Sequence, residues 1–124
     1  MEKNYLNEMK IAEEFFDAVR KNINSSGRTS TNRLYFAFEK AVISYIYFKK
    51  RDVPKNHQKL WELSSELLGK EYYSLFRVLY DLRMQADYGN ISIFADLNIK
   101  NIQENLNKAE SLAKELKLRM KDEK

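Results

Sequence analysis

The scarcity of helix-breaking residues constrains the fold of this chain more than any other feature. Its 124 residues include only three glycines and one proline, namely Gly27, Pro54, Gly69 and Gly89. In the long segments between them, apolar residues recur at alternating steps of three and four. That spacing is typical of amphipathic helices, whereas half-buried strands show strict alternation. The sequence therefore predicts helices joined by short loops.

Five apolar stripes give the approximate bounds of five helices. The predicted helices cover residues 5–23, about 29–49, 57–68, 70–88 and about 98–119. We expect Gly27 to cap the first helix in a left-handed conformation, and a hydroxyl among residues 29–31 to cap the second. The apolar run 91–95 is expected to pack over one end of the helices. The prediction is an all-α protein with a single domain, residues 1–124, folded as a five-helix up-and-down bundle.

Composition narrows the classes of function. The chain has no cysteine and one histidine, so we expect neither disulfides nor a metal site, and no cofactor. No apolar run approaches the roughly 18 residues that a membrane span requires. The first ten residues lack the apolar core of a signal peptide. We therefore expect a cytoplasmic protein without membrane association.

Positive charge is concentrated in one part of the chain. Between Arg20 and Lys59 there are ten Lys or Arg residues and two acids, a net charge of +8, whereas the whole chain carries +4. A local basic excess is expected of a phosphate-binding face. The alternative is a solvated surface whose charge is offset by the acids of the first helix. The sequence leaves both interpretations open.

Arg83 is the most unusual charged residue. It follows Phe76 and Leu79 by helical steps, so its side chain should point inward or toward a partner. An unpaired buried guanidinium is costly, and Arg83 therefore needs a carboxylate, a carbonyl or a phosphate. A salt bridge to Asp81, Asp87 or an acid of another helix would make it structural. A phosphate ligand would make it functional.

Three short motifs occur in order along most of the chain: Asn32-Arg33-Leu34-Tyr35-Phe36-Ala37-Phe38 at the start of the second helix, Asn56-His57 at the start of the third, and Arg83-x-x-Ala86-Asp87-Tyr88 at the end of the fourth. In composition and order these motifs resemble those of the HEPN family, small all-helical proteins of prokaryotic defence and toxin–antitoxin systems. The last motif resembles the Arg-x-x-Ala-Asp-Tyr ending of one archaeal and bacterial branch. The resemblance implies a HEPN-like bundle.

Ribonuclease members of the family carry Arg, then four to six residues, then His at the end of this helix. The resemblance implies that the arginine binds phosphate while the histidine moves protons, and that two subunits form one cleft. Here Tyr88 occupies the histidine position. Tyrosine has a pKa near 10 and histidine near 6.5, so tyrosine is a poor general base at neutral pH. Losing a matched base typically removes about two to four orders of magnitude of rate.

The only histidine, His57, could replace the missing imidazole. In an up-and-down bundle the start of the third helix, the end of the fourth and the basic loop 49–55 would share one end. That grouping gives candidate phosphate-binding residues Lys50, Arg51, Lys55 and Arg83, and candidate catalytic residues Arg83, Tyr88 and His57. If the third helix crosses obliquely, the grouping fails.

The motif residues of the second helix have weaker functional expectations. By the same reasoning, Arg33 would lie at the opposite end from Arg83, about 25–30 Å away along the second helix. It is kept as a candidate for phosphate binding, although a structural or dimer-contact role is favoured. Tyr35, Phe36 and Phe38 are expected to serve packing, with base stacking as the alternative.

The resemblance also implies partners. We expect a homodimer joined through helices rich in Tyr and Phe, and frequent pairing with a small nucleotidyltransferase encoded next door. The favoured hypothesis is an RNA- or nucleotide-associated partner of that enzyme in a toxin–antitoxin or defence module. One alternative is a metal-independent endoribonuclease toxin that uses Arg83 with Tyr88 or His57. Another is a purely structural homodimer. The sequence does not decide whether the chain cleaves RNA.

Overall fold

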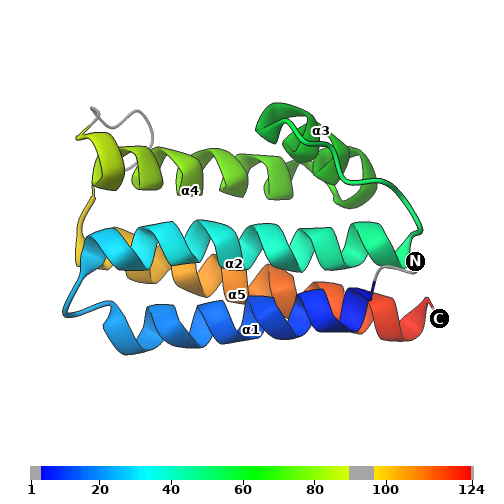
Figure 1. The fold of residues 1–124 in the computed structure, drawn as a ribbon, viewed down its shortest axis with the longest axis horizontal. Helices are drawn as coiled ribbons and strands as arrows, with labels where there is room; N and C mark the ends of the chain where they lie inside the picture. The colour runs from blue at the N-terminus through cyan, green and yellow to red at the C-terminus, as the bar shows by residue number, and fades with distance from the viewer. Residues whose placement is uncertain (1–3, 90–96, 124) are drawn as a thin grey trace.

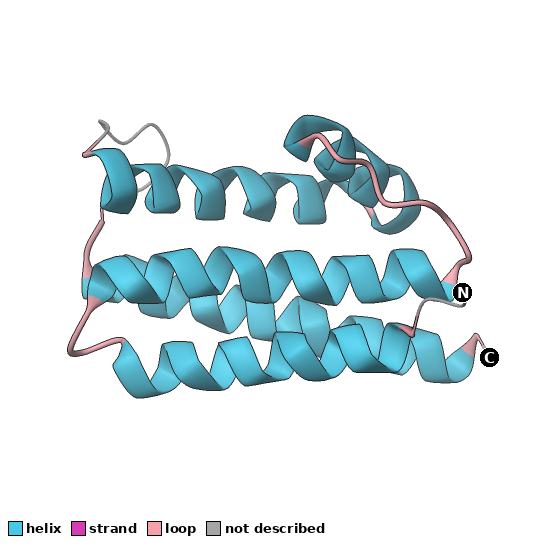
Figure 2. Ribbon diagram, viewed as in Figure 1, coloured by secondary structure: helices cyan, strands magenta, loops and turns pink. Residues whose placement is uncertain are grey.

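The structure is a computed structural model that describes residues 4–89 and 97–123. Within these residues the regular elements are all helices (Figure 2). They are α1 (Tyr5–Asn22), α2 (Gly27–Phe48), α3 (His57–Leu68), α4 (Lys70–Tyr88) and α5 (Ile99–Asp122). The predicted all-α, five-helix bundle is confirmed. The predicted apolar patch at 91–95 lies outside the described residues.

The four long helices α1, α2, α4 and α5 lie side by side with their axes roughly along one direction, and the short α3 lies beside the first half of α4 (Figure 1). Helix α2 is central, since α1, α4 and α5 all pack against it. Because α3 does not cross the length of the bundle, α4 runs opposite to α2. The last residue of α4, Tyr88, therefore lies at the end of the bundle where α2 begins.

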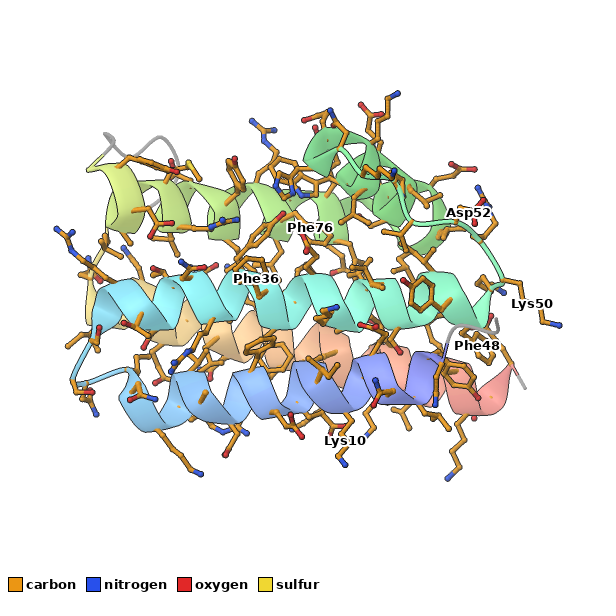
Figure 3. The ribbon with its side chains drawn as sticks, viewed as in Figure 1. Lys10, Phe36, Phe48, Lys50, Asp52 and Phe76 are labelled. Atoms are coloured by element: carbon orange, nitrogen blue, oxygen red, sulfur yellow. The ribbon has the colours of Figure 1, made fainter. Side chains whose placement is uncertain are left out.

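The core follows the apolar stripes that the sequence predicts. Helix α2 is buried along most of its length, which fits its apolar, β-branched and aromatic composition. The Phe38 ring lies 4.7 Å from that of Phe76 on α4, and the Phe36 and Phe76 side chains lie between α2 and α4 (Figure 3). Tyr35, Tyr45 and Tyr72 are fully buried within one chain. These rings pack in the core of a single chain and are not surface available to a second subunit. The predicted homodimer therefore stays a prediction.

The helix caps correct one expectation from the sequence. Gly27 is the first residue of α2 and its φ is not positive, so it does not cap α1 in a left-handed conformation. Ser26 is the N-cap of α2, and its hydroxyl accepts a hydrogen bond from the Thr29 amide at 3.3 Å. The predicted cap at residues 29–31 is wrong because α2 begins earlier and the Ser26 hydroxyl accepts from the Thr29 amide.

Helix α4 ends at Gly89, where the backbone adopts a conformation that favours glycine. Gly89 has φ 66° and ψ 24°, the left-handed conformation, and its amide donates to the carbonyl of Gln85. This conformation stops α4 directly after Tyr88. None of the helices in the described part of the chain is both long and apolar enough to span a bilayer.

Candidate functional site

Arg83 lies in a cradle of three aromatic rings. Its guanidinium carbon is 4.9 Å from the centre of the Phe36 ring, 5.4 Å from Tyr35 and 5.9 Å from Tyr80. These distances fall within the cation–π range, so the ring quadrupoles offset part of the hydration that the arginine loses. The side chain is 21% exposed. The predicted inward position of Arg83 is confirmed, and the aromatic cradle explains how the charge is tolerated there.

Arg83 has an incomplete set of polar partners. Its buried Nε lies 3.6 Å from Oδ2 of Asp87, one turn later on α4, but makes no hydrogen bond. Of the predicted acidic partners, Asp87 is thus the one near Arg83, while Asp81 accepts a hydrogen bond from Gln85. Within residues 4–89 and 97–123, the terminal nitrogens of Arg83 donate no hydrogen bond. The guanidinium is thus held by rings, and most of its donors make no hydrogen bond to the described part of the chain.

His57 is positioned by a hydrogen-bond network on the same cradle. Its Nδ1 lies 3.0 Å from the Tyr35 hydroxyl, which also accepts a hydrogen bond from Nε1 of Trp61 at 3.2 Å. Burial and the nearby charge of Glu39 raise the pKa of Tyr35, so its hydroxyl stays protonated. With its oxygen accepting from Trp61, Tyr35 can donate its proton to Nδ1. Neutral His57 then carries its own proton on Nε2.

Glu39 is the second polar neighbour of His57. Its Oε2 lies 3.7 Å from Nδ1, is buried, and makes no hydrogen bond among the described residues. The His57 side chain is 47% exposed, whereas that of Glu39 is only 15% exposed. A protonated imidazole would therefore find a carboxylate on its inner side. The exposed part of the His57 side chain is available for contact with a ligand.

Tyr35 brings His57 and Arg83 together. The His57 ring centre lies 5.8 Å and the Arg83 guanidinium carbon 5.4 Å from the Tyr35 ring centre, so the two groups are at most about 11 Å apart. The path of the chain that brings His57 and Arg83 together differs from the predicted path. The loop 49–56 leads back along α2, because Tyr35 precedes Phe48 by 13 residues, about 20 Å of helix. His57 thus lies beside the middle of α2, where it meets Tyr35 and Glu39.

The predicted grouping of the basic loop with Arg83 is therefore wrong for Lys50 and Arg51. Lys50 lies at the far end of α2 (Figure 3), and the Arg51 amide donates to the carbonyl of Ile46. That carbonyl is ten residues beyond Phe36, about 15 Å along the helix. The prediction assumed that each helix crosses the length of the bundle. The short α3 does not, so α4 runs in the opposite direction to the one assumed. Lys55 stands two residues before His57 and is the basic residue of this loop nearest to His57 in the sequence.

Arg33 lies at the same end of the bundle as Arg83, contrary to expectation. It precedes Phe36, the nearest ring to Arg83, by three residues, about 4.5 Å along α2. The predicted separation of 25–30 Å is wrong because α4 runs antiparallel to α2. Tyr88 also lies at this end, but its side chain is 71% exposed. Arg83 points inward from α4 while Tyr88 points to solvent.

The sequence reasoning missed Tyr80 and the role of Glu39. Tyr80 precedes Arg83 by three residues, and this spacing was a usable signal because such side chains are neighbours on a helix. Glu39 stands four residues after Tyr35, an isolated acid in the largely apolar α2. That placement could have indicated a buried polar partner. Within the described residues, no three His, Cys, Asp or Glu side chains gather as a metal site would need.

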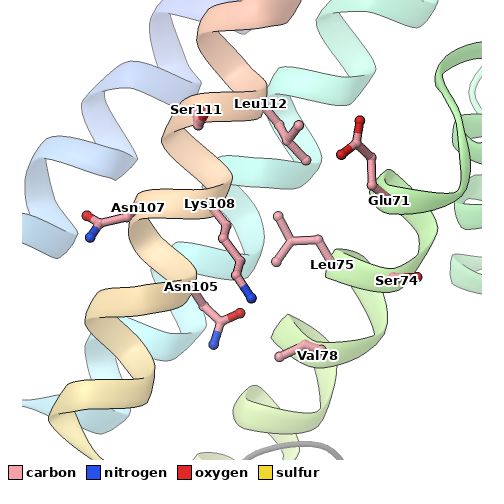
Figure 4. A pocket seen from close by; sticks show the side chains of 9 residues that line it. All are labelled: Glu71, Ser74, Leu75, Val78, Asn105, Asn107, Lys108, Ser111 and Leu112. Carbon is pink, nitrogen blue, oxygen red and sulfur yellow. The ribbon is translucent and has the colours of Figure 1, made fainter.

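A second feature lies on the other flank of α4. An open groove of about 670 Å³ separates α4 from α5, with Leu75 and Leu112 between walls that carry Glu71 and Lys108 (Figure 4). Arg83 contacts α2 instead, so the groove is separate from the aromatic cradle. The groove offers apolar surface and exposed charges.

Comparison with known proteins supports the interpretation of the fold. The family model of the HEPN domain matches residues 7–119, which is most of the chain. The protein therefore belongs to the HEPN family. A search of curated proteins found no significant match. The narrower Arg-x-x-Ala-Asp-Tyr branch stays a prediction from the sequence.

Proposed function

We propose that this HEPN protein binds a phosphate group of RNA or of a nucleotide through Arg83. One observation carries the proposal: the guanidinium is fixed by three rings, while its terminal nitrogens have no hydrogen-bond partner among the described residues. Arginine binds phosphate through charge-assisted, often bidentate hydrogen bonds. A preorganised guanidinium loses little conformational entropy when it does so. Asp87 faces Nε and leaves the terminal nitrogens for the ligand.

The proposed biological role is that of a partner protein. Membership of the HEPN family supports an association with RNA or nucleotides, and the motif resemblance supports pairing with a small nucleotidyltransferase in a toxin–antitoxin or defence module. Binding is favoured over cleavage because Tyr88 stands where ribonuclease members have histidine. A tyrosine can donate a hydrogen bond to phosphate, but it is poorly matched to act as a base.

A metal-independent endoribonuclease is the second candidate, and the position of His57 favours it. The half-exposed imidazole lies on the same aromatic cradle as Arg83. When the Tyr35 hydroxyl donates to Nδ1, Nε2 of neutral His57 carries the proton and presents a donor to a ligand. His57 would need the other tautomer to accept a proton from a 2′-hydroxyl. The arrangement thus supports ligand contact more directly than base catalysis.

The experiment compares cleavage with binding. Purified protein is incubated with RNA without added metal, and RNA integrity and RNA binding are measured in parallel. The proposal expects binding without cleavage, loss of binding in Arg83→Ala, and co-purification with a co-expressed neighbouring nucleotidyltransferase. Cleavage that Arg83→Ala and His57→Ala abolish would instead establish the ribonuclease. Loss of stability in Arg83→Ala, without binding in either protein, would leave only a structural role.

A further inference from the structure

We propose that the rings of Tyr80 and His57 form a stacking site for one nucleobase beside Arg83. The proposal rests on the phosphate contact proposed for Arg83 and adds the part of the ligand that carries the base. The ligand class is a nucleotide, either free or as an unpaired residue of an RNA chain. Neither Tyr80 nor the pairing of its ring with His57 belongs to the three motifs that indicated the family.

Tyr80 adjoins both the imidazole of His57 and the guanidinium of Arg83. Its ring centre is 5.4 Å from that of His57 and 5.9 Å from the guanidinium carbon of Arg83. Tyr80 is only partly buried, and nearly half of the His57 side chain is exposed. Two partly exposed rings therefore adjoin a cation whose terminal nitrogens donate no hydrogen bond to the residues that the structure describes. A base and its phosphate are attached to one ribose, so a single nucleotide can contact both parts of this surface.

The rings are fixed before any ligand arrives. Trp61 packs edge-on against Tyr80, with ring centres 5.3 Å apart. It also stacks on the buried Phe76, with ring centres 6.0 Å apart. The Tyr35 hydroxyl holds Nδ1 of His57. A preorganised surface avoids much of the entropy cost of ordering side chains on binding. Stacking of a base on such rings depends little on which base it is.

The arrangement favours a nucleotide over simpler ligands. Inorganic phosphate would use Arg83 but leave both rings uncovered, and an uncharged aromatic ligand would use the rings but not the guanidinium. The nearest acids do not occupy the proposed contacts: Glu39 lies on the buried side of His57, and Asp87 faces Nε of Arg83. The combination of cation and rings is what single-stranded nucleic-acid sites generally use.

The chain contains its own reporter for this test. Trp61 is the only tryptophan, and its ring centre lies 5.3 Å from Tyr80 and 6.4 Å from His57. A base stacked on these rings should change Trp61 fluorescence. The probes are AMP, ribose 5-phosphate and a single-stranded oligoadenylate, the second measured by competition. Tyr80→Leu and His57→Ala test the site. Tyr5→Leu is the matched control, since Tyr5 packs at 5.1 Å against Phe48 at the other end of the bundle.

The proposal expects Tyr80→Leu to weaken AMP or oligoadenylate binding about 5- to 150-fold, the range for one lost base–aromatic stack. Ribose 5-phosphate should bind both proteins equally, and Tyr5→Leu should change nothing. His57→Ala, at a more exposed position, should give a loss in the same direction. Binding of oligoadenylate without AMP would assign the base to RNA, whereas binding of both would admit free nucleotides.

Two outcomes would overturn the inference, and they differ from failure of the phosphate site. The stacking site is wrong if AMP and oligoadenylate bind with Arg83-dependent affinity that neither Tyr80→Leu nor His57→Ala changes. It is also wrong if the wild-type protein binds ribose 5-phosphate as tightly as AMP. If no probe binds, or if Arg83→Ala leaves all binding unchanged, the proposed phosphate contact itself fails.

Discussion

The guanidinium of Arg83 on α4 lies 4.9 Å from the ring of Phe36 on α2. This contact joins the first motif of the sequence to the last one, because α4 runs antiparallel to α2. It holds the arginine charge against apolar surface, with one carboxylate 3.6 Å from Nε. The arrangement explains how a cation can sit on the inward stripe of a helix and still have donors for a ligand.

Replacing Tyr88 tests whether the absence of histidine at this position limits RNA cleavage. We expect Tyr88→His to fold with unchanged stability, because Tyr88 is exposed. The substitution restores the Arg, four residues, His spacing of ribonuclease members, so RNA cleavage should rise by about two to four orders of magnitude. Cleavage of a fluorescent RNA at neutral pH measures the rate. Tyr88→His combined with Arg83→Ala is the control and should be inactive; no gain in Tyr88→His would show that the site cannot use a base there.

The Tyr35 hydroxyl should contribute to stability. Tyr35→Phe removes the acceptor of the Trp61 indole N–H and the partner of His57. Since Trp61 is nearly buried, its donor would lose its partner, at a cost of about 1–3 kcal/mol in the free energy of unfolding. Urea denaturation followed by Trp61 fluorescence measures this. An unchanged midpoint would mean that water replaces the hydroxyl.

Stability should fall at alkaline pH. Burial, followed by the charge of a nearby glutamate, raises the pKa of Tyr35 and likewise that of Tyr72, whose hydroxyl donates to Glu115. The unfolded chain therefore loses these protons first, at a pKa near 10. Stability is complete below pH 10 and is lost above it, by about 1.4 kcal/mol per pH unit for each of the two groups. Unfolding measured from pH 8 to 11 should show this slope, and Tyr72→Phe should reduce it. A slope that Tyr72→Phe leaves unchanged would contradict the assignment.

The left-handed cap after Tyr88 should require glycine. At φ 66° a β-carbon costs about 1–2 kcal/mol, so Gly89→Ala should lower the free energy of unfolding by that amount. Gly27→Ala is the matched control, because Gly27 is not left-handed and an added β-carbon would meet Ile102 at an ordinary 3.4 Å. Thermal unfolding of both variants checks the prediction. Equal effects would show that the end of α4 is not fixed by Gly89.

The sequence predicts the helices well because their apolar stripes are long and local. The inward position of Arg83 follows from the same periodicity. The path of the chain between α2 and α4 does not, since no local pattern states that the loop 49–56 runs back along α2 and that α3 fails to cross the bundle. Because of this path, Lys50 and Arg51 lie far from Arg83, and Arg33 lies at the same end of the bundle as Arg83. The sequence spacing marks Tyr80 as a neighbour of Arg83 on one helix face and Glu39 as an isolated acid on α2. Their place beside His57 follows only from the tertiary contacts.

The central claim is that Arg83 binds phosphate, and its most direct test is RNA affinity in two arginine variants. Arg119 is a close structural match: its Nε lies 3.5 Å from Glu123, its guanidinium carbon lies 5.5 Å from the Tyr45 ring, and it belongs to α5 at the other end of the bundle. We predict that Arg83→Ala weakens binding of a single-stranded RNA at least tenfold at low salt, while Arg119→Ala does not. Equal affinities in the two variants, with both folded, would contradict the account.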